Sequence, residues 1–350
     1  MVFSKTLLAK KCKRLSALNF SKKCTSCASG VYKRNSSSSV SVIFQKPTVV
    51  FVVILRKGRM GTGTKINIKL KAHLKGHNGG IYSLAKGDDS HFYTAGADGW
   101  IAKWNPSKSE DGELVAQCDE PLYTLLHHKK NLYAGSSQGH IFILSSGNNV
   151  RKIEAHTRGV FFIKALNNGF ITGGGDGKLM VWNGSMEWQK TLQLSPQSLR
   201  TCLIDENKIT VAGSEGTLFF LNDTIRNIQS IKAHKNSIFA LCKVADQLIS
   251  GGRDAELRFW KNDQMQGHVP AHLLHIHGLS SHPSLPIFAS ASMDKTCKIW
   301  TASGKLLKVL NAEKFGGHIN SVNACLWLNE STLITVSDDK TCMVYALEIV

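Results

Sequence analysis

One short phrase recurs at a nearly constant interval between residues 94 and 345. Its five clear copies each run from a Ser or Thr through an Asp to an aromatic residue: TAGADGWIAKW (94–104), TGGGDGKLMVW (172–182), SGGRDAELRFW (250–260), SASMDKTCKIW (290–300) and TVSDDKTCMVY (335–345). Two weaker copies, AGSSQGHIFIL (134–144) and VAGSEGTLFFL (211–221), fill the gaps, so there are seven copies separated by steps of 38 to 45 residues. Such a period indicates repeated copies of one supersecondary unit.

Each unit consists of short, β-branched, alternating runs such as IYSLAKG and KLMVW, separated by turn residues. This pattern is typical of strands, and helical spacing is absent. Four short strands per unit of about 40 residues predict an all-β fold: a seven-bladed β-propeller of four-stranded antiparallel blades. The seven turn positions are Asp98, Gln138, Asp176, Glu215, Asp254, Asp294 and Asp339, and the positions 20 to 22 residues before them are His77, Gln117, His156, Ser195, His234, His272 and His318.

These features resemble the WD-repeat family over residues 64–350. The family marks are the Gly-His pairs at 76–77 and 317–318, the turn Asp and the aromatic residue six positions later. The chain departs from the pattern because Asn105, Asn183, Lys261 and Thr301 follow the Trp where the family has its second Asp. The resemblance implies that an N-terminal strand at about 64–71 completes the last blade beside residues 340–350. That pairing would close the ring and remove an exposed sheet edge.

Five repeats combine an imidazole, a hydroxyl and a carboxylate, the side chains of a nucleophilic triad. One catalytic site is not built five times at a constant period, and the resemblance implies buried structural networks in which the Asp accepts from the His and the His bonds the hydroxyl. The residues are His77, Thr94, Asp98 and Trp104; His156, Thr172, Asp176 and Trp182; His234, Ser250, Asp254 and Trp260; His272, Ser290, Asp294 and Trp300; and His318, Thr335 and Asp339. We predict that no residue is catalytic, and that the second and fourth blades rely on apolar packing alone.

Equivalent positions of a propeller form a circle, so one position across the repeats describes one surface. Five residues after the His position, or six in the second repeat, lie Tyr82, Tyr123, Phe161, Arg200, Phe239, His277 and Asn323. Aromatic residues and Arg are enriched in binding hot spots, and the resemblance implies that this ring lies at the mouth of the central channel. We predict that it binds a partner together with Arg253 and Asp338 from a second ring; the alternative is that the aromatic residues are channel packing.

Residues 1–60 form a separate, basic and Ser-rich segment. They hold 13 of the 43 Lys and Arg residues and none of the 25 Asp and Glu residues. We expect a disordered tail, an organelle transit peptide or a stretch outside the mature protein, with Met60 as a possible start and residues 61–350 as the propeller. The longest apolar stretch, residues 48–55, is too short to span a membrane as a helix. Cys24 and Cys27 have the spacing of half a zinc site, but nothing nearby completes it.

The remaining candidate sites lack residues that metal binding or nucleotide binding would need. The histidines at 268, 272, 275, 277 and 282 cluster in sequence without a clear fourth ligand, and the glycines at 173–175 lack the Lys-Ser/Thr of a phosphate-binding loop. We therefore predict no metal and no cofactor. Residues 61–350 have 30 basic against 25 acidic residues, which argues against nucleic-acid binding by the propeller.

The sequence thus predicts a non-catalytic interaction scaffold that binds a peptide or partner domain of unknown identity on the channel face. The alternative is a small-molecule-binding or enzymatic propeller with its site in the channel. We expect a monomeric propeller within a complex, in contact with neither nucleic acid nor membrane. Its six cysteines after residue 60 form no close pairs, so we expect a cytoplasmic location unless residues 1–60 direct import into an organelle.

Overall fold

The computed structural model describes residues 29–33, 39–43, 66–88, 90–107, 112–145, 149–206, 208–226 and 228–349. The chain divides into two compact units, residues 1–58 and 59–350. In the first unit, β1 (Ser29–Lys33) pairs antiparallel with β2 (Ser39–Ile43). The other residues of the predicted leader, among them Cys24, Cys27 and Met60, lie outside the described residues.

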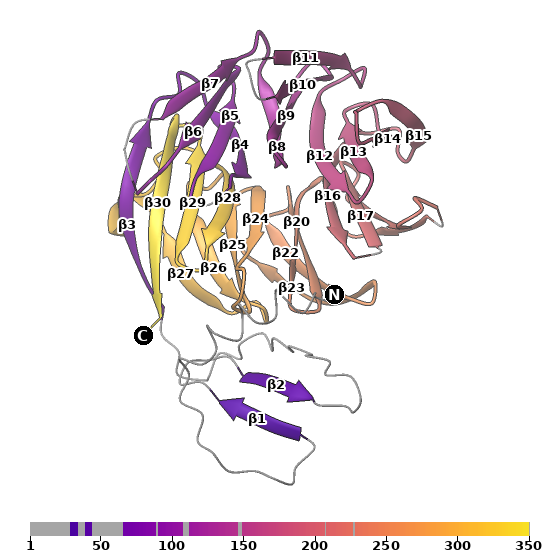
Figure 1. Ribbon diagram of the computed structural model, residues 1–350. Coiled ribbons are helices and arrows are strands. Elements are labelled where there is room, and N and C mark those ends of the chain that lie inside the picture. Colours follow the sequence, from indigo (N-terminus) through magenta and orange to yellow (C-terminus); the bar gives the residue numbers. More distant parts are fainter. Residues whose placement is uncertain are drawn as a thin grey trace. The chain divides into compact units, whose positions relative to one another are not determined.

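In the second unit the described residues form seven antiparallel four-stranded sheets, here called blades 1 to 7, which follow one another around a central axis (Figure 1). Blade 1 contains β4 (Ile81–Lys86), β5 (Phe92–Gly96), β6 (Trp100–Trp104) and β7 (Glu113–Gln117). Blade 2 contains β8 (Leu122–His128), β9 (Asn131–Ser136), β10 (His140–Ser145) and β11 (Asn149–Glu154). Blade 3 contains β12 (Val160–Leu166), β13 (Gly169–Gly174), β14 (Lys178–Asn183) and β15 (Trp188–Gln193).

The next three blades repeat this plan. Blade 4 contains β16 (Leu199–Asp205), β17 (Lys208–Gly213), β18 (Thr217–Asn222) and β19 (Gln229–Lys232). Blade 5 contains β20 (Ile238–Val244), β21 (Gln247–Gly252), β22 (Glu256–Lys261) and β23 (Gln264–Pro270). Blade 6 contains β24 (Ile276–Ser281), β25 (Ile287–Ser292), β26 (Cys297–Thr301) and β27 (Leu306–Leu310).

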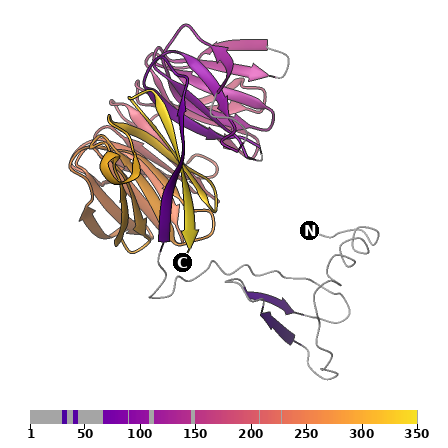
Figure 2. The same cartoon turned by 90° about the vertical axis from the view of Figure 1, so that its left-hand side faces the viewer.

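Blade 7 joins the two ends of the ring. It contains β28 (Val322–Asn329), β29 (Thr332–Ser337), β30 (Thr341–Ile349) and, as its outer strand, β3 (Ile66–Lys75). β3 runs antiparallel to β30 from Ile66 opposite Ile349 to Lys75 opposite Thr341, seen as the indigo strand beside the yellow one (Figures 1 and 2). The prediction of a seven-bladed propeller closed by an N-terminal strand is confirmed, and the strand continues to residue 75 rather than ending at 71.

The buried apolar residues form a cluster at every junction between neighbouring blades. Phe259 of blade 5, for example, packs in one cluster with Phe288 and Trp300 of blade 6. The other clusters join blades 6 and 7, 7 and 1, 1 and 2, 2 and 3, 3 and 4, and 4 and 5. Because burial of apolar area is the main favourable term in folding, the blades stabilise one another rather than standing alone.

The turn after the second strand of each blade needs one residue with positive φ. Gly177 has φ 73°, and a Cβ added there would lie 1.9 Å from the carbonyl oxygen of Ser195. In blades 5 to 7 the same place is taken by Ala255, Lys295 and Lys340, with φ of 61°, 69° and 67°. Glycine is therefore favoured by this turn but not required in every blade.

The longest step of the repeat, before His318, contains a single helical turn, α2 (Ala312–Phe315). The side chain of Asn311 caps it by accepting a hydrogen bond from the N–H of Lys314, and Phe315 packs against the cluster between blades 6 and 7. No helix among the described residues is long and apolar enough to span a bilayer.

Candidate functional site

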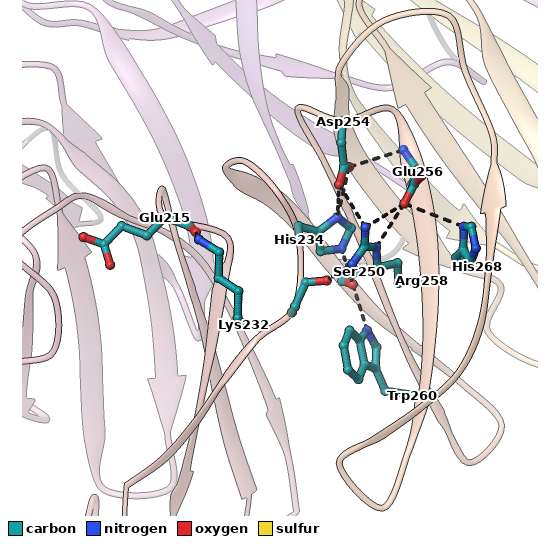
Figure 3. A network of polar contacts seen from close by, with 10 residues as sticks. Glu215, Lys232, His234, Ser250, Asp254, Glu256, Arg258, Trp260 and His268 are labelled. Carbon is teal, nitrogen blue, oxygen red and sulfur yellow. Dashed lines mark hydrogen bonds and ion pairs between the residues drawn. The ribbon is translucent and has the colours of Figure 1, made fainter.

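Blade 5 contains a buried polar network that links β21 and β22 to the segment before β20. His234 Nδ1 lies 2.9 Å from Asp254 Oδ2, and His234 Nε2 lies 2.7 Å from Ser250 Oγ. Trp260 Nε1 donates to the same Ser250 oxygen at 2.9 Å. Figure 3 shows the imidazole between Asp254 and Ser250, with Arg258 reaching Asp254 and Glu256. The carboxylate therefore orients the His, and the His and Trp together satisfy the hydroxyl.

The same arrangement recurs in four further blades. The imidazole lies 2.8 to 2.9 Å from the nearest Asp oxygen and 2.7 to 2.9 Å from the hydroxyl in each of them. The sets are His77, Asp98, Thr94 and Trp104 in blade 1; His156, Asp176, Thr172 and Trp182 in blade 3; His272, Asp294, Ser290 and Trp300 in blade 6; and His318, Asp339, Thr335 and Tyr345 in blade 7. The structure thus brings together every set that the sequence grouped.

The environment of these carboxylates keeps them ionised. Burial alone would raise the pKa of Asp176, but the hydrogen bond and charge of His156 and two backbone N–H groups lower it to about 2. The pKa values of Asp98, Asp254, Asp294 and Asp339 are lowered for the same reasons. The five hydroxyls are fully buried, with 0% exposure, so a substrate cannot reach them in this structure.

Blade 2 contradicts the prediction that it relies on apolar packing alone. Glu120, only 4% exposed, lies 2.7 Å from both His140 Nδ1 and Lys152 Nζ. Burial would raise the pKa of Glu120, but hydrogen bonds from Lys152, Ser136 and His140 lower it to about 2. The repeat pattern does not reveal this network, because its three ionisable residues occupy none of the repeat positions. Only their proximity in the folded blade reveals it.

Blade 4 has no such imidazole network. Ser195 stands where five other blades have His, and among the described residues its hydroxyl accepts from the N–H of Gln197. The positions equivalent to the hydroxyl and the Trp are Val211 and Leu221, both buried in the cluster between blades 3 and 4. The prediction of apolar packing describes this blade correctly.

Seven residues form what we call the collar, and each is the second residue of an innermost strand. All seven line one cavity of about 820 Å³. They are Tyr82 on β4, Tyr123 on β8, Phe161 on β12, Arg200 on β16, Phe239 on β20, His277 on β24 and Asn323 on β28. The spacing of the repeats predicts these residues as one ring, and the structure brings them together around one cavity.

A β-bulge explains why the collar residues point into the cavity. In every blade the register of the innermost strand skips the collar residue, as between Leu199 and Thr201, where Arg200 has no partner on β17. The residue before it is a fully buried aliphatic side chain, such as Leu199 or Ile238. A bulge leaves one residue unpaired and bends the strand locally, which redirects that side chain, so the fold presents one residue per blade to the channel.

The aromatic part of the collar is a continuous series of ring contacts. The ring centroids of Tyr82 and Tyr123 are 5.9 Å apart, and those of Tyr123 and Phe161 are 5.5 Å apart with nearly parallel planes. The guanidinium carbon of Arg200 lies 4.2 Å from the centroid of Phe161 and 5.7 Å from that of Phe239. These contacts hold flat surfaces side by side, a geometry suited to stacking against a ligand.

The remaining part of the collar is polar. The amide Nδ2 of Asn323 donates to Asp338 at 2.7 Å and to the carbonyl oxygen of Ile81 at 3.0 Å. His277 lies edge-on to Phe239 with centroids 5.7 Å apart, and burial, with the nearby His275, lowers its pKa. Asp338 therefore lines the cavity and is held by a collar residue.

Arg253 differs from the other predicted binding residues. It is exposed and does not line the cavity, although its charge contributes, after burial, to the lowered pKa of His275. Lys164 does line the cavity and was missed, because it lies deeper along β12 than the ring that the spacing selected. Among the described residues, no three His, Cys, Asp or Glu side chains are arranged to hold a metal ion.

Comparisons with known sequences agree with this geometry. A family model described as "WD domain, G-beta repeat" matches residues 68–105, 147–183, 264–301 and 305–346. The chain is 22% identical over 213 residues to "DENN domain and WD repeat-containing protein SCD1" of Arabidopsis thaliana, covering 58% of this chain and 18% of that protein. It is 30% identical over 102 residues to "Striatin-4" of Mus musculus, covering 26% of this chain and 13% of that protein. The matches thus span under one fifth of these curated relatives.

A third related sequence and a solved structure are also similar to this chain. The chain is 22% identical over 128 residues to "Guanine nucleotide-binding protein subunit beta-1" of Caenorhabditis briggsae, covering 35% of this chain and 38% of that protein. Among solved structures, the WD40 beta propeller domain of Doa1 superposes with a TM-score of 0.71 at 19% identity, over 80% of this chain and 97% of that chain. This structural likeness concerns the fold alone.

Proposed function

Because this chain is a seven-bladed WD-repeat propeller, we propose that it is a non-catalytic interaction scaffold that binds a peptide or partner domain at the collar. Propellers of this family generally serve protein interaction. Fold alone does not locate a binding site, so the proposal depends on the side chains of the channel mouth.

The observation that carries the proposal is the composition of the collar. Four of its seven side chains are aromatic and one is Arg, the residue types that dominate binding energy in protein interfaces. Tyr123 remains 36% exposed, and the rest of the collar is half-buried around an open cavity of about 820 Å³. Side chains serving only as packing would be expected to reach the low exposure of the aliphatic residues beside them.

The blade networks support a scaffold rather than an enzyme. Their carboxylates, imidazoles and hydroxyls resemble catalytic sets, but each hydroxyl is fully buried and already bonded to a His and, in four blades, to a Trp. A nucleophile needs access to substrate as well as an adjacent base. Each of these hydroxyls has an adjacent imidazole but is not accessible to a substrate.

Affinity capture with the purified full chain tests the proposal. Wild type is compared with a Tyr123→Ala/Phe161→Ala variant, which removes the parallel ring pair of the collar. The matched control is Trp188→Ala, which removes a 58% exposed aromatic ring from the outer strand β15, outside the cavity. Circular dichroism verifies that all three proteins are folded before binding is measured.

We expect at least one protein that binds wild type and Trp188→Ala and is lost from the double variant. Partners retained by all three proteins would show that the collar is packing and that binding uses another surface. Capture of no protein, with a small molecule protecting wild type against heat, would overturn the proposal in favour of a small-molecule propeller.

A further inference from the structure

Arg200 differs from the other collar residues because it places a positive charge among aromatic rings. Its Nε donates to Ser214 Oγ at 2.9 Å, which fixes the orientation of the guanidinium and leaves both terminal nitrogens unbonded in the described structure. Within that part of the chain, no carboxylate lies within ion-pair distance of Arg200, whose contacts are Ser214 and the rings of Phe161 and Phe239. A half-buried cation of this kind has lost water without gaining a counter-ion.

The charges around the cavity are separated. Lys164, on the neighbouring blade 3, lines the same cavity and adds a second positive charge on this side. The acidic residue of the lining, Asp338, lies three blades away in blade 7 and is bonded to Asn323. An anion entering the channel is therefore attracted to the blade 3–4 side.

The geometry around Arg200 favours a flat anion. The rings of Phe161 and Phe239 both contact the guanidinium, and Ser214 occupies its Nε, so the two terminal nitrogens form the edge that remains available. Two parallel N–H···O bonds from such an edge match the two oxygens of one carboxylate. A planar carboxylate also continues the layer of stacked rings, whereas a tetrahedral phosphate does not.

An apolar surface adjoins the collar on blade 6. Leu273 is 88% exposed, and Leu274 and Met293 are 45% and 42% exposed. The N–H of Met293 donates to the carbonyl oxygen of His275, whose ring lies 6.1 Å from that of Phe239. Exposed large apolar side chains at the rim of a charged cavity indicate a second contact for the same ligand.

We propose that the collar binds a peptide segment of a partner protein in which an Asp or Glu side chain pairs with the terminal nitrogens of Arg200. A large apolar residue of the same segment lies on Leu273, Leu274 and Met293. This inference rests on the proposed function, since it assigns the chemistry of the partner at the collar. The ion pair supplies specificity, and the apolar contact supplies buried area.

The test is selection from a library of short random peptides on the immobilised full chain, followed by fluorescence-anisotropy titration of the selected peptide. Four proteins are compared: wild type, Arg200→Gln, Leu273→Ser and the control Arg226→Gln. Arg226 is exposed at an outer turn of the same blade 4 and does not line the cavity, so the control makes the same charge change elsewhere. The selected peptide is also made with its acidic residue changed to the amide and to phosphoserine.

We expect selected peptides to share an acidic and a large apolar residue. Loss of a bidentate charged pair should weaken binding about 10- to 100-fold in Arg200→Gln, and the amide peptide should lose a similar factor on wild type. Leu273→Ser should weaken binding by a smaller factor of about 3 to 10, and Arg226→Gln should not change it. The amide peptide should bind Arg200→Gln no more weakly than the acidic peptide does.

Three results would overturn the inference while leaving the proposed function intact. The first is selection of peptides without an acidic residue, whose binding depends on Tyr123 and Phe161 but not on Arg200. The second is tighter binding of the phosphoserine peptide than of the acidic one, which would assign the site to phosphate. The third is equal loss in the control Arg226→Gln, which would indicate a general charge effect. Selection of no peptide that depends on the collar would instead count against the proposed function.

Discussion

Blades 4 and 5 are neighbours with the same strand order and different interiors. Blade 5 holds His234, Ser250 and Trp260 in a hydrogen-bonded set, whereas blade 4 has Val211 and Leu221 at the hydroxyl and indole positions. Removing both partners of a buried hydrogen bond together costs little, while removing one costs the desolvation of the other. The polar network is therefore one of several possible interiors for a blade, and it stabilises the blade only when all its partners are present.

Blade 2 shows a third solution. Its hydroxyl and indole positions are Ala134 and Leu144, both buried, and its polar group is the Glu120 set beside them. The three interiors accompany the same four-stranded architecture. Specific polar geometry therefore adds rigidity to a blade whose topology is set by strand pattern and apolar packing.

The largest expected effect is acid destabilisation of the blades that carry carboxylate networks. The folded-state pKa values of the five turn Asp residues and Glu120 lie below their ordinary values, so their contribution to stability is complete above about pH 4.5 and is lost as pH falls towards 2. We expect the urea midpoint, followed by tryptophan fluorescence, to fall steeply in this window. Asp176→Asn should reduce the slope, and a midpoint independent of pH there would contradict the network interpretation.

The next largest effect is a difference in stability loss between the acidic turn residues of blades 5 and 4. Asp254→Ala leaves a buried imidazole without its acceptor and should lower the free energy of unfolding by about 2–4 kcal/mol. Glu215→Ala, at the equivalent position, should change it by less than about 0.5 kcal/mol, because the Glu215 side chain points away from any network (Figure 3). Equal losses in urea titrations of the two variants would refute the distinction.

A change in the network of blade 2 should cost less stability than Asp254→Ala and more than Glu215→Ala. Glu120→Gln removes the charge shared by His140 and Lys152 and should cost about 1–3 kcal/mol. The control is Asp119→Asn, since Asp119 is exposed and lies 3.9 Å from the same Lys152. Thermal unfolding at neutral pH checks the pair, and a loss from Asp119→Asn as large as that from Glu120→Gln would count against a buried network.

A smaller loss than that of Asp254→Ala is expected from giving blade 4 an incomplete network. Val211→Thr places a hydroxyl where no imidazole or indole can reach it, and it should destabilise by about 1–2 kcal/mol. The reverse change in blade 7, Thr335→Val, should cost more, because it leaves His318 unsatisfied. Chemical denaturation of both variants measures the difference, and stabilisation by Val211→Thr would show that blade 4 already offers a partner.

Most of the fold could be predicted from the sequence, because the repeated phrase marks a turn in each blade and, in five blades, the residues of a buried hydrogen-bond network. The sequence also placed Asp98 with His77 and Thr94, since the same spacing recurs. It did not reveal Glu120 with His140 and Lys152, because a network that occurs once leaves no period to detect. Only the folded blade brings these side chains together.

The sequence predicted the seven collar residues but not which other charged residues line the cavity, and the reason is physical. The spacing identified equivalent positions, but it treated Arg253 and Arg200 alike. The structure separates them, because the bulge turns Arg200 into the cavity while Arg253 lies in an exposed turn. Register irregularities of this kind are not visible in a hydrophobic pattern of period two.

In the proposed division of roles, the blade networks stabilise the fold and the collar binds the partner. The most direct measurement is the urea midpoint and partner capture of Tyr123→Ala/Phe161→Ala beside Asp254→Ala, in the full chain. We expect the collar variant to unfold closer to wild type than Asp254→Ala does and to capture no partner, whereas folded Asp254→Ala still captures it. A collar variant that unfolds at lower urea than Asp254→Ala, or that keeps its partner, would contradict this division of roles.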